Sequence, residues 1–375
     1  MKTQSTHIYI FILLALLSVG CNKKLNYEFS EIQEKHVSNF DPGYEAYCNL
    51  DLNSDFELNA VQCSFYGDYQ NAIDQATKRE VHKQEAMMSI FHQTADIADL
   101  IKSLEIALQN PKADDSYKAS IQNMLNLLTT PPAHELFAQA KAVNAVDYIT
   151  KKAKDFHFAL INEAHFNSQH RAFTNALLKP LWDEGYRYLA LETLGYDDKD
   201  IHERGYPVSS TGYYTKDSHF GNLVREALQL GYTLITYETQ NDHDGTLRDR
   251  DQAHNIFEQT WKKDKNGKVL IHAGYGHISE MGNTHYEPMG FQLKKLINQD
   301  ILTIDQENMV GFTDSAKQHQ YYKEAANQFD LNEPTAFLND TDKIIVDPVN
   351  SIGIDIQVYH PDTKFVNGRP DWMKR

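Results

Sequence analysis

Residues 156–165 read FHFALINEAH, and residues 186–192 read YRYLALE. Each apolar run has the length of a buried strand and stops abruptly at ionisable side chains, Glu163 and His165 in the first run and Glu192 in the second. A segment of helical length separates them, which is typical of a βαβ unit. Ligands of open α/β sheets bind beyond the carboxyl ends of the strands. We therefore expect these three side chains to lie together at such an edge.

From residue 157 onward, strand patterns alternate with helix patterns. The expected strands are 157–161, 188–191, 233–237, 269–272 and 301–304, and the expected helices are 168–184, 218–230, 249–263 and 288–298. This alternation predicts an α/β domain over 155–360, with a mostly parallel sheet flanked by helices. Gly185 and Gly231 each follow a helix and precede a strand, where a left-handed cap is common. Segments 343–346 and 352–358 are expected as later strands, at an edge of the sheet, and 361–375 as a loose tail.

The region before this domain has a different pattern. Between residues 56 and 154 apolar side chains recur at helical spacing, which predicts an N-terminal helical subdomain. We find no second copy of any segment at a fixed period, so a repeat array is not expected. Residues 21–55 are polar and irregular and are interpreted as a tether.

The first residues are typical of an export signal. Lys2 precedes the apolar run Ile8–Val19, which is short for a membrane span and suits a signal peptide over 1–20. Ser18-Val19-Gly20-Cys21 resembles the lipobox of bacterial lipoproteins, which implies lipidation of Cys21 and attachment to a membrane of the bacterial cell envelope. A plain secretory signal and an uncleaved anchor are the alternatives.

The charge and the cysteine content of the chain limit the kinds of partner and of catalytic chemistry that are expected. The chain of 375 residues has a formal net charge of −16, which argues against a non-specific nucleic-acid binder, since that needs a basic surface. If Cys21 is lipidated, Cys48 and Cys63 remain; they either pair, as an oxidising compartment allows, or stay as buried thiols. All three cysteines precede the candidate site, and no Gly-x-Ser-x-Gly element occurs, so neither a cysteine nucleophile nor a serine elbow is expected.

Further ionisable groups follow the later strands. Glu238 ends the third strand as Glu192 ends the second, and a carboxylate there is either a structural acceptor of backbone N–H groups or an acid–base group with a shifted pKa. Residues 248–255, RDRDQAHN, are either a charged helix start or part of a site. His272 and His277 flank a glycine turn that contains Tyr275, and we expect at least one of the two histidines to be functional.

Together these elements resemble the erythromycin esterase and ChaN-like superfamily, whose more distant relatives are of the TraB and Tiki type. Glu163-Ala164-His165 is similar to the family's Gly-Glu-x-His element, with Asn162 in place of the glycine. Arg248-Asp249-Arg250-x-x-Ala253-x-Asn255 is similar to the esterase Arg-Asp-Arg-x-Met-Ala-x-Asn helix, with Gln252 in place of Met. Ala273-Gly274-Tyr275-Gly276-His277 resembles the Ala-Gly-Asn-Gly-His element of the ChaN-like lipoproteins.

The resemblance implies an esterase-like hydrolase that acts with water on an unknown ester or amide. His165 would be the general base, Glu192 its orienting partner, and Arg250 the group that stabilises an oxyanion. The implied catalytic residues are Glu163, His165, Glu192, His277 and Arg250, and the implied substrate-binding residues are Arg171, Arg248, Glu238 and Tyr275.

Two alternatives follow from other members of the superfamily. As in the metal-dependent relatives, a divalent ion would be held by His165, Glu163, Glu192 and His277. As in the ChaN-like lipoproteins, the chain would instead bind haem without catalysis, with Tyr275 or His277 as the ligand. The partner is therefore expected to be a small-molecule substrate or haem.

Overall fold

The computed structural model describes residues 56–73, 133–282, 286–311, 319–347, 353–366 and 368–373, with a few isolated positions between 105 and 122. The predicted signal peptide, the tether and most of the predicted helical region lie outside these residues, as do Cys21 and Cys48. Cys63 is disulfide-bonded. Within the described part of the chain, no helix has the length and apolar character needed to cross a membrane.

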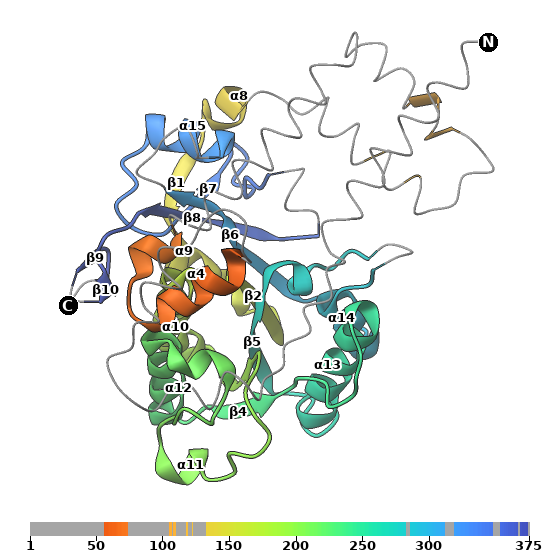
Figure 1. Cartoon of the computed structure of the whole chain (residues 1–375). Helices are drawn as coiled ribbons and strands as arrows, with labels where there is room; N and C mark the ends of the chain where they lie inside the picture. Colours follow the sequence, from red (N-terminus) through yellow and green to blue (C-terminus); the bar gives the residue numbers. More distant parts are fainter. Residues whose placement is uncertain are drawn as a thin grey trace, which may run out of the picture. The chain divides into compact units, whose positions relative to one another are not determined.

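An eight-stranded sheet forms the centre of the fold, in the order β1-β7-β8-β6-β2-β5-β3-β4 (Figure 1). The strands are β1 (Lys141–Asn144), β2 (Phe158–Glu163), β3 (Tyr186–Leu191), β4 (Thr233–Thr236), β5 (Lys268–Gly274), β6 (Leu302–Gly311), β7 (Thr335–Leu338) and β8 (Ile356–Asp362). The strands from β8 to β4 in that order are parallel, whereas β7 is antiparallel to both its neighbours. The predicted α/β class with a mostly parallel sheet is confirmed.

Helices cover both faces of the sheet (Figure 1). One face packs against α9 (Ala145–Ala153), α10 (Ser168–Asp183) and α12 (Ser218–Leu230), and the other against α13 (Gly245–Gln259) and α14 (Met289–Ile297). Along β2, Ala159 and Ile161 lie in the first core and Phe158 and Leu160 in the second. Because both faces are buried, the strand reads as a continuous apolar run.

The remaining described elements lie around this centre. They are α4 (Phe56–Phe65), α8 (Ala133–Phe137), α11 (Ile201–Arg204), η2 (Tyr213–Lys216), η3 (Tyr275–Ile278) and α15 (Gln320–Gln328). The segment that carries α4 packs on α12, since the Tyr69 and Ser218 hydroxyl oxygens are 2.5 Å apart. Gly185 and Gly231 have φ of 92° and 97°, as their positions after helices predicted.

Several predictions for the C-terminal part are wrong. Strand β8 lies between β6 and β7 and is not an edge strand, and residues 343–346 contribute only a single bridge, between Ile344 and Leu338. The expected loose tail contains a two-stranded hairpin, β9 (Phe365–Val366) and β10 (Arg369–Pro370). This hairpin contacts α12, where His219 Nε2 lies 2.7 Å from the Gly368 carbonyl oxygen.

One prediction for the region before the α/β domain is also wrong. Residues 141–144, within the predicted helical region, form β1.

The strand register brings the predicted groups to one edge. Glu163 pairs with Gly274 and Leu191 with His272, so β2, β5 and β3 end side by side. Asn162, which replaces the glycine of the family pattern, is buried and joins β2 to β6. Its Nδ2 donates to Asp305 at 2.7 Å, and its Oδ1 accepts from the Gln306 N–H at 2.8 Å. The amide side chain thus fixes the backbone just before Glu163.

Candidate active site

A buried ion pair lies at the end of β2. Arg171, in the first turns of α10, donates to both oxygens of Glu163, from Nε to Oε2 at 2.7 Å and from Nη2 to Oε1 at 2.7 Å. Both side chains are almost completely buried. Burial alone would raise the pKa of Glu163, but Arg171 and His272 hold it well below its ordinary value. Glu163 is therefore a carboxylate at neutral pH.

Glu163 orients two histidines. His165 Nδ1 lies 3.0 Å from Oε1, and His272 Nε2 lies 2.8 Å from Oε2. The other nitrogen of His272 lies 3.0 Å from the hydroxyl of Thr174 on α10. Since a carboxylate only accepts hydrogen bonds, each histidine presents an N–H to Glu163. For neutral His165, this leaves the Nε2 lone pair available.

Arg171 also bridges to the start of α12. Its Nη1 lies 3.4 Å from the Oδ2 of Asp217, the buried cap whose Oδ1 accepts the backbone N–H groups of His219 and Phe220. The guanidinium lies over the ring of Tyr214, 4.9 Å from its centroid. The Tyr214 ring in turn stacks on His165 at 4.6 Å. The same cation thus fixes the carboxylate and one aromatic wall beside His165.

A second guanidinium joins the ends of β3 and β4. Arg248, near the start of α13, donates from Nη2 to Glu192 Oε1 at 2.8 Å, and its Nε and Nη2 donate to Glu238 at 2.9 and 2.6 Å. The other Glu192 oxygen accepts the Gly274 N–H at 2.6 Å. Burial would raise the pKa of Glu192, whereas His165 and Arg248 lower it to about 2.

His277 forms a second imidazole–carboxylate pair. Its Nδ1 lies 2.8 Å from Asp249 Oδ2, which also accepts from the Tyr286 hydroxyl at 2.7 Å and from the Met289 N–H at 2.9 Å. Its Nε2 lies 3.2 Å from Arg248 Nη1. Burial alone would lower the pKa of His277, but Asp249 more than offsets this and the pKa is raised. Since a guanidinium only donates, His277 accepts from Arg248 at Nε2 and donates to Asp249 from Nδ1.

Backbone geometry at this edge is unusual. A Cβ at Gly274 would collide with the His165 ring, so the ring lies directly against the backbone of β5. Thr193 and Tyr275, which directly follow Glu192 and Gly274, have φ of 61° and 47°. A β-branched residue with positive φ is rare and costs roughly 1–3 kcal/mol, and such strain concentrates at functional sites.

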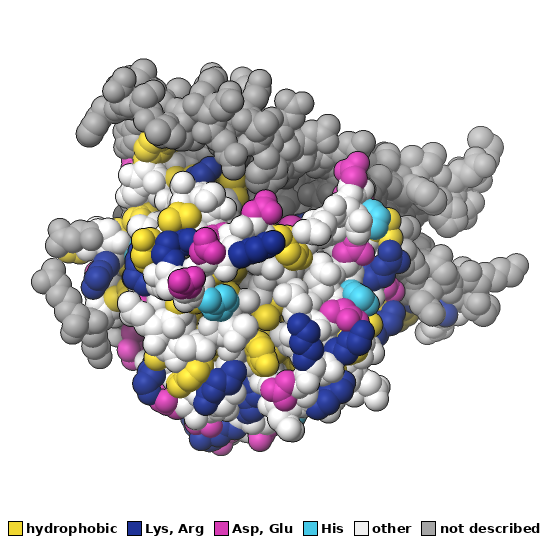
Figure 2. Space-filling view, turned by 90° about the horizontal axis from the view of Figure 1, so that it is seen from below, with side chains coloured by type: hydrophobic (Ala, Val, Ile, Leu, Met, Phe, Trp, Pro, Cys, Tyr) yellow, Lys and Arg dark blue, Asp and Glu magenta, His cyan; other side chains and the backbone are white. Residues whose placement is uncertain are grey.

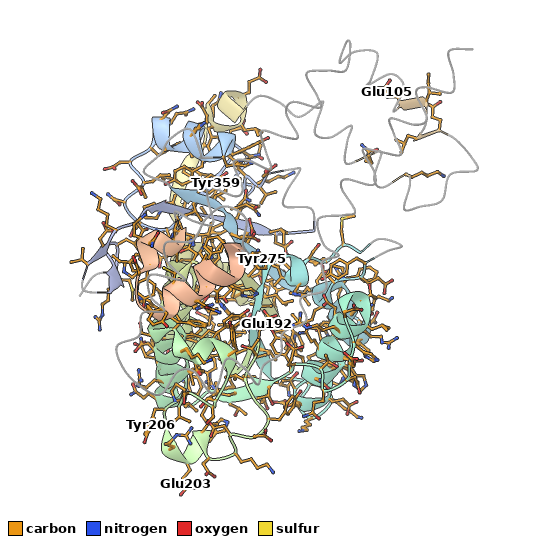
Figure 3. All side chains as sticks on the ribbon, viewed as in Figure 1. Glu105, Glu192, Glu203, Tyr206, Tyr275 and Tyr359 are labelled. Carbon is orange, nitrogen blue, oxygen red and sulfur yellow. The ribbon has the colours of Figure 1, made fainter. Side chains whose placement is uncertain are left out.

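With the exception of Arg250, the predicted site residues form one continuous set of contacts. Glu192 and Tyr275 lie in the interior between the helical layers, whereas Glu203 and Tyr206 lie at the periphery (Figure 3). Among the site histidines, His165 and His277 are partly open, with 14% and 20% of their side chains exposed. Tyr275 contacts the edge of the His165 ring at 4.8 Å.

The prediction that Arg250 belongs to the site is wrong, because its side chain is exposed on α13. It makes no hydrogen bond or ion pair to any residue that the structure describes. Residues two apart on a helix point to different sides, so Arg248 and Arg250 cannot both face the sheet. Because α13 begins at Gly245, four residues earlier than predicted, Arg248 and Asp249 fall within its first turns. Arg248, and not Arg250, contacts the other predicted site residues.

Two carboxylates of the site were not among the predicted site residues. Asp249 belongs to the segment 248–255, which was predicted as either a charged helix start or part of a site, and was not named as a site residue itself. Asp217 was not identified at all, and its only signal is its position as a cap before α12. His272 was noted as a candidate and is buried against Glu163.

The donor groups do not fit a metal ion. Within the described ranges, no group of three or more His, Cys, Asp or Glu side chains is arranged to hold one. The physical reason is that Arg171 binds both oxygens of Glu163, and Arg248 and the Gly274 N–H bind the two oxygens of Glu192. The expected haem ligand His277 has both ring nitrogens engaged, with Asp249 and Arg248.

Comparison with known proteins gives no family. No family model matches the chain, and no curated protein matches it. Among solved structures it is similar to the type III effector HopBA1, with a TM-score of 0.37 and 12% identity, over 62% of this chain and 99% of that one. It is also similar to RRSP, a MARTX toxin effector domain from Vibrio vulnificus CMCP6, with a TM-score of 0.33 and 14% identity. That match covers 65% of this chain and 50% of the other. At these TM-scores, the likeness carries no functional argument.

Removing the guanidinium of Arg171 should destabilise the fold. Arg171→Met leaves Glu163 and Asp217 buried without a cation, which we expect to cost about 3–5 kcal/mol in the free energy of unfolding in urea. Lys179→Met is the matched control on the same helix, since Lys179 pairs with Asp183 at the surface; its cost should stay below about 0.5 kcal/mol. Equal effects of the two substitutions would contradict the buried pair.

Glu192 should make stability depend on pH in the acid range. Its folded-state pKa of about 2 lies below the ordinary 4.5, so the ionised group stabilises the fold above pH 4.5. This contribution is lost as the pH falls from 4.5 towards 2 and amounts to about 3 kcal/mol. The difference in unfolding free energy between the wild type and Glu192→Gln should therefore shrink across this window. A difference that does not change with pH would show that Glu192 is not held as a carboxylate.

Proposed function

We propose that the protein hydrolyses an ester or amide by attack of water, with His165 as the general base. The observation that carries this is the position of His165. Its Nδ1 is held by the buried Glu163–Arg171 pair, and its Nε2 accepts no hydrogen bond from any other residue in the described part of the chain. A partly exposed imidazole with one nitrogen fixed and the other open is the arrangement that proton abstraction requires.

The proposed reaction uses the other groups in defined roles. His165 Nε2 takes a proton from water as the oxygen attacks the carbonyl carbon, and the carbonyl π electrons move to oxygen. Glu192, a carboxylate near His165, stabilises the imidazolium that forms. We assign the oxyanion to the guanidinium of Arg248, which is partly exposed, whereas Arg171 is buried. When the carbon–leaving-group bond breaks, the His165 imidazolium returns its Nε2 proton to the departing oxygen or nitrogen. His277, which accepts from Arg248 at Nε2 and donates from Nδ1 to Asp249, holds that guanidinium in place.

The motif resemblance supports the same class of reaction. The erythromycin-esterase-like elements around Glu163, Glu192, Arg248 and His277 are the segments that meet at the end of the sheet. We further propose that the protein works in the bacterial envelope, attached to the membrane through lipidated Cys21. The lipobox-like sequence before Cys21 supports this attachment.

His165→Gln should lower kcat for any ester that the wild type hydrolyses by about 10²–10⁴-fold, the usual contribution of a general base. Gly274→Ala should also lower kcat, because the added methyl group displaces the His165 ring. Gly276→Ala is the matched control, since a Cβ there meets no atom within 4 Å. Initial rates on a panel of esters, with circular dichroism to verify folding, measure these effects. Full activity of folded His165→Gln would contradict the mechanism.

The two arginines of α13 should differ in their effect. Arg248→Gln removes the cation next to Glu192 and should lower kcat by about 10²–10³-fold, as loss of an oxyanion donor does. Arg250→Gln has the same change of charge on the exposed side of the helix and should leave kcat within about twofold. The outcome that opposes this assignment is a larger loss for Arg250→Gln than for Arg248→Gln, measured under the same conditions.

A further inference from the structure

One wall of the site, called the α13 wall below, consists of Arg248, Asp249 and Gln252 on α13 and of Glu192 and Glu238, which follow β3 and β4. This wall has more hydrogen-bond acceptors than donors. Glu192, Glu238 and Asp249 lie within hydrogen-bond distance of Arg248 or of the His277 ring that it contacts, and Arg248 is the guanidinium group they share. Glu238 is the most open of these carboxylates, with 24% of its side chain exposed. On the deeper side, Arg171 faces both Glu163 and Asp217. Carboxylates therefore outnumber guanidinium groups throughout the site.

Two acceptors of this wall have no partner among the residues that the structure describes. Asp249 Oδ1 and Gln252 Oε1 are buried and accept no hydrogen bond from any of these residues. The two residues lie three positions apart on the buried side of α13, and Gln252 Nε2 already donates to Glu238 at 3.0 Å. A buried acceptor without a donor costs roughly 1–3 kcal/mol. The same wall that is acidic thus also lacks hydrogen-bond donors.

The pKa of Tyr237, which lies next to these carboxylates, responds to their negative charge. Tyr237 is buried and donates to the His272 carbonyl oxygen at 3.0 Å. Burial raises its pKa, and Glu192, Glu238 and Asp249 raise it further against the opposing effect of Arg248. Elsewhere, on the face that Figure 2 shows, basic and acidic side chains are interspersed. The carboxylates of the site thus add to the negative charge that the chain carries as a whole.

We propose that the substrate of this hydrolase carries a cationic, hydrogen-bond-donating group, such as an ammonium, which lies along the α13 wall beside Glu238 and Gln252. This inference rests on the proposed function and names its substrate class. A cation gains from the local potential and from the unpartnered acceptors. An anionic substrate, such as a phosphate or carboxylate ester, would be repelled by the same groups.

The test compares esters of matched shape and different charge. Cationic 5-aminopentyl acetate, its uncharged isostere hexyl acetate and anionic 6-acetoxyhexanoate are offered to the whole chain. We expect kcat/KM to fall in that order, with about a tenfold advantage of the cationic over the neutral ester, equivalent to about 1.4 kcal/mol. The advantage should diminish as ionic strength rises, because salt screens the field. Equal rates for the cationic and neutral esters would overturn the inference and leave the proposed hydrolase standing.

A pair of variants locates the preference. Glu238→Gln removes the open carboxylate and should reduce the preference for the cationic ester to about threefold or less. Glu258→Gln removes the same charge from the exposed side of α13, where Glu258 pairs with Lys262, and should preserve the preference. If both variants preserve it, the α13 wall does not bind the cation.

Direct binding separates this inference from the proposed function. Calorimetric titration with 5-aminopentan-1-ol and with its uncharged isostere hexan-1-ol does not depend on turnover. Tighter binding of the amino alcohol, weakened by Glu238→Gln, supports the cation site even if no ester is hydrolysed, in which case the proposed function fails alone. Binding of the two compounds with equal affinity, or binding of neither, overturns the cation site.

Discussion

The buried pair of Arg171 and Glu163 is the constraint on which the rest of the site depends. A carboxylate at the end of a fully buried strand is costly unless a cation and hydrogen bonds surround it. Arg171 supplies the cation from α10, and the second side of the same guanidinium faces Asp217 at the start of α12. One interaction therefore ties β2 to both helices on that face of the sheet. Glu163, saturated in this way, fixes the ring of His165.

Arg248, from α13 on the opposite face of the sheet, likewise binds two carboxylates, but it is more exposed than Arg171. It links the carboxylates that follow β3 and β4, Glu192 and Glu238, but a quarter of its side chain is exposed, whereas Arg171 is buried. The first guanidinium therefore acts as a support, and the second lies where a substrate can reach it. Both of these carboxylates stand at carboxyl ends of parallel strands, which is where open α/β sheets place their ligands.

Much of this was predictable from local pattern, and the failures have physical causes. The apolar runs that end in Glu163 and Glu192 predicted the central strands and the shared edge, because fully buried parallel strands leave a clear signal. Strand β7 was missed because it does not follow the parallel alternation of strands and helices: it pairs antiparallel with β8 and with β1, which lies far from it in the sequence. Arg248 and Arg250 could not be ranked without the true start of α13, and Asp217 approaches Arg171 only in the folded chain.

The most direct test of the account is the tautomer of His165, measured by ¹⁵N NMR of the imidazole nitrogens in the folded protein. The hydrogen bond to Glu163 requires the proton of the neutral ring on Nδ1, which leaves Nε2 as the base. We predict the chemical shift of a protonated nitrogen for Nδ1 and of an unprotonated nitrogen for Nε2. In Glu163→Gln, the proton should no longer be fixed on Nδ1. A neutral ring that carries its proton on Nε2 would contradict the role of His165 as the general base.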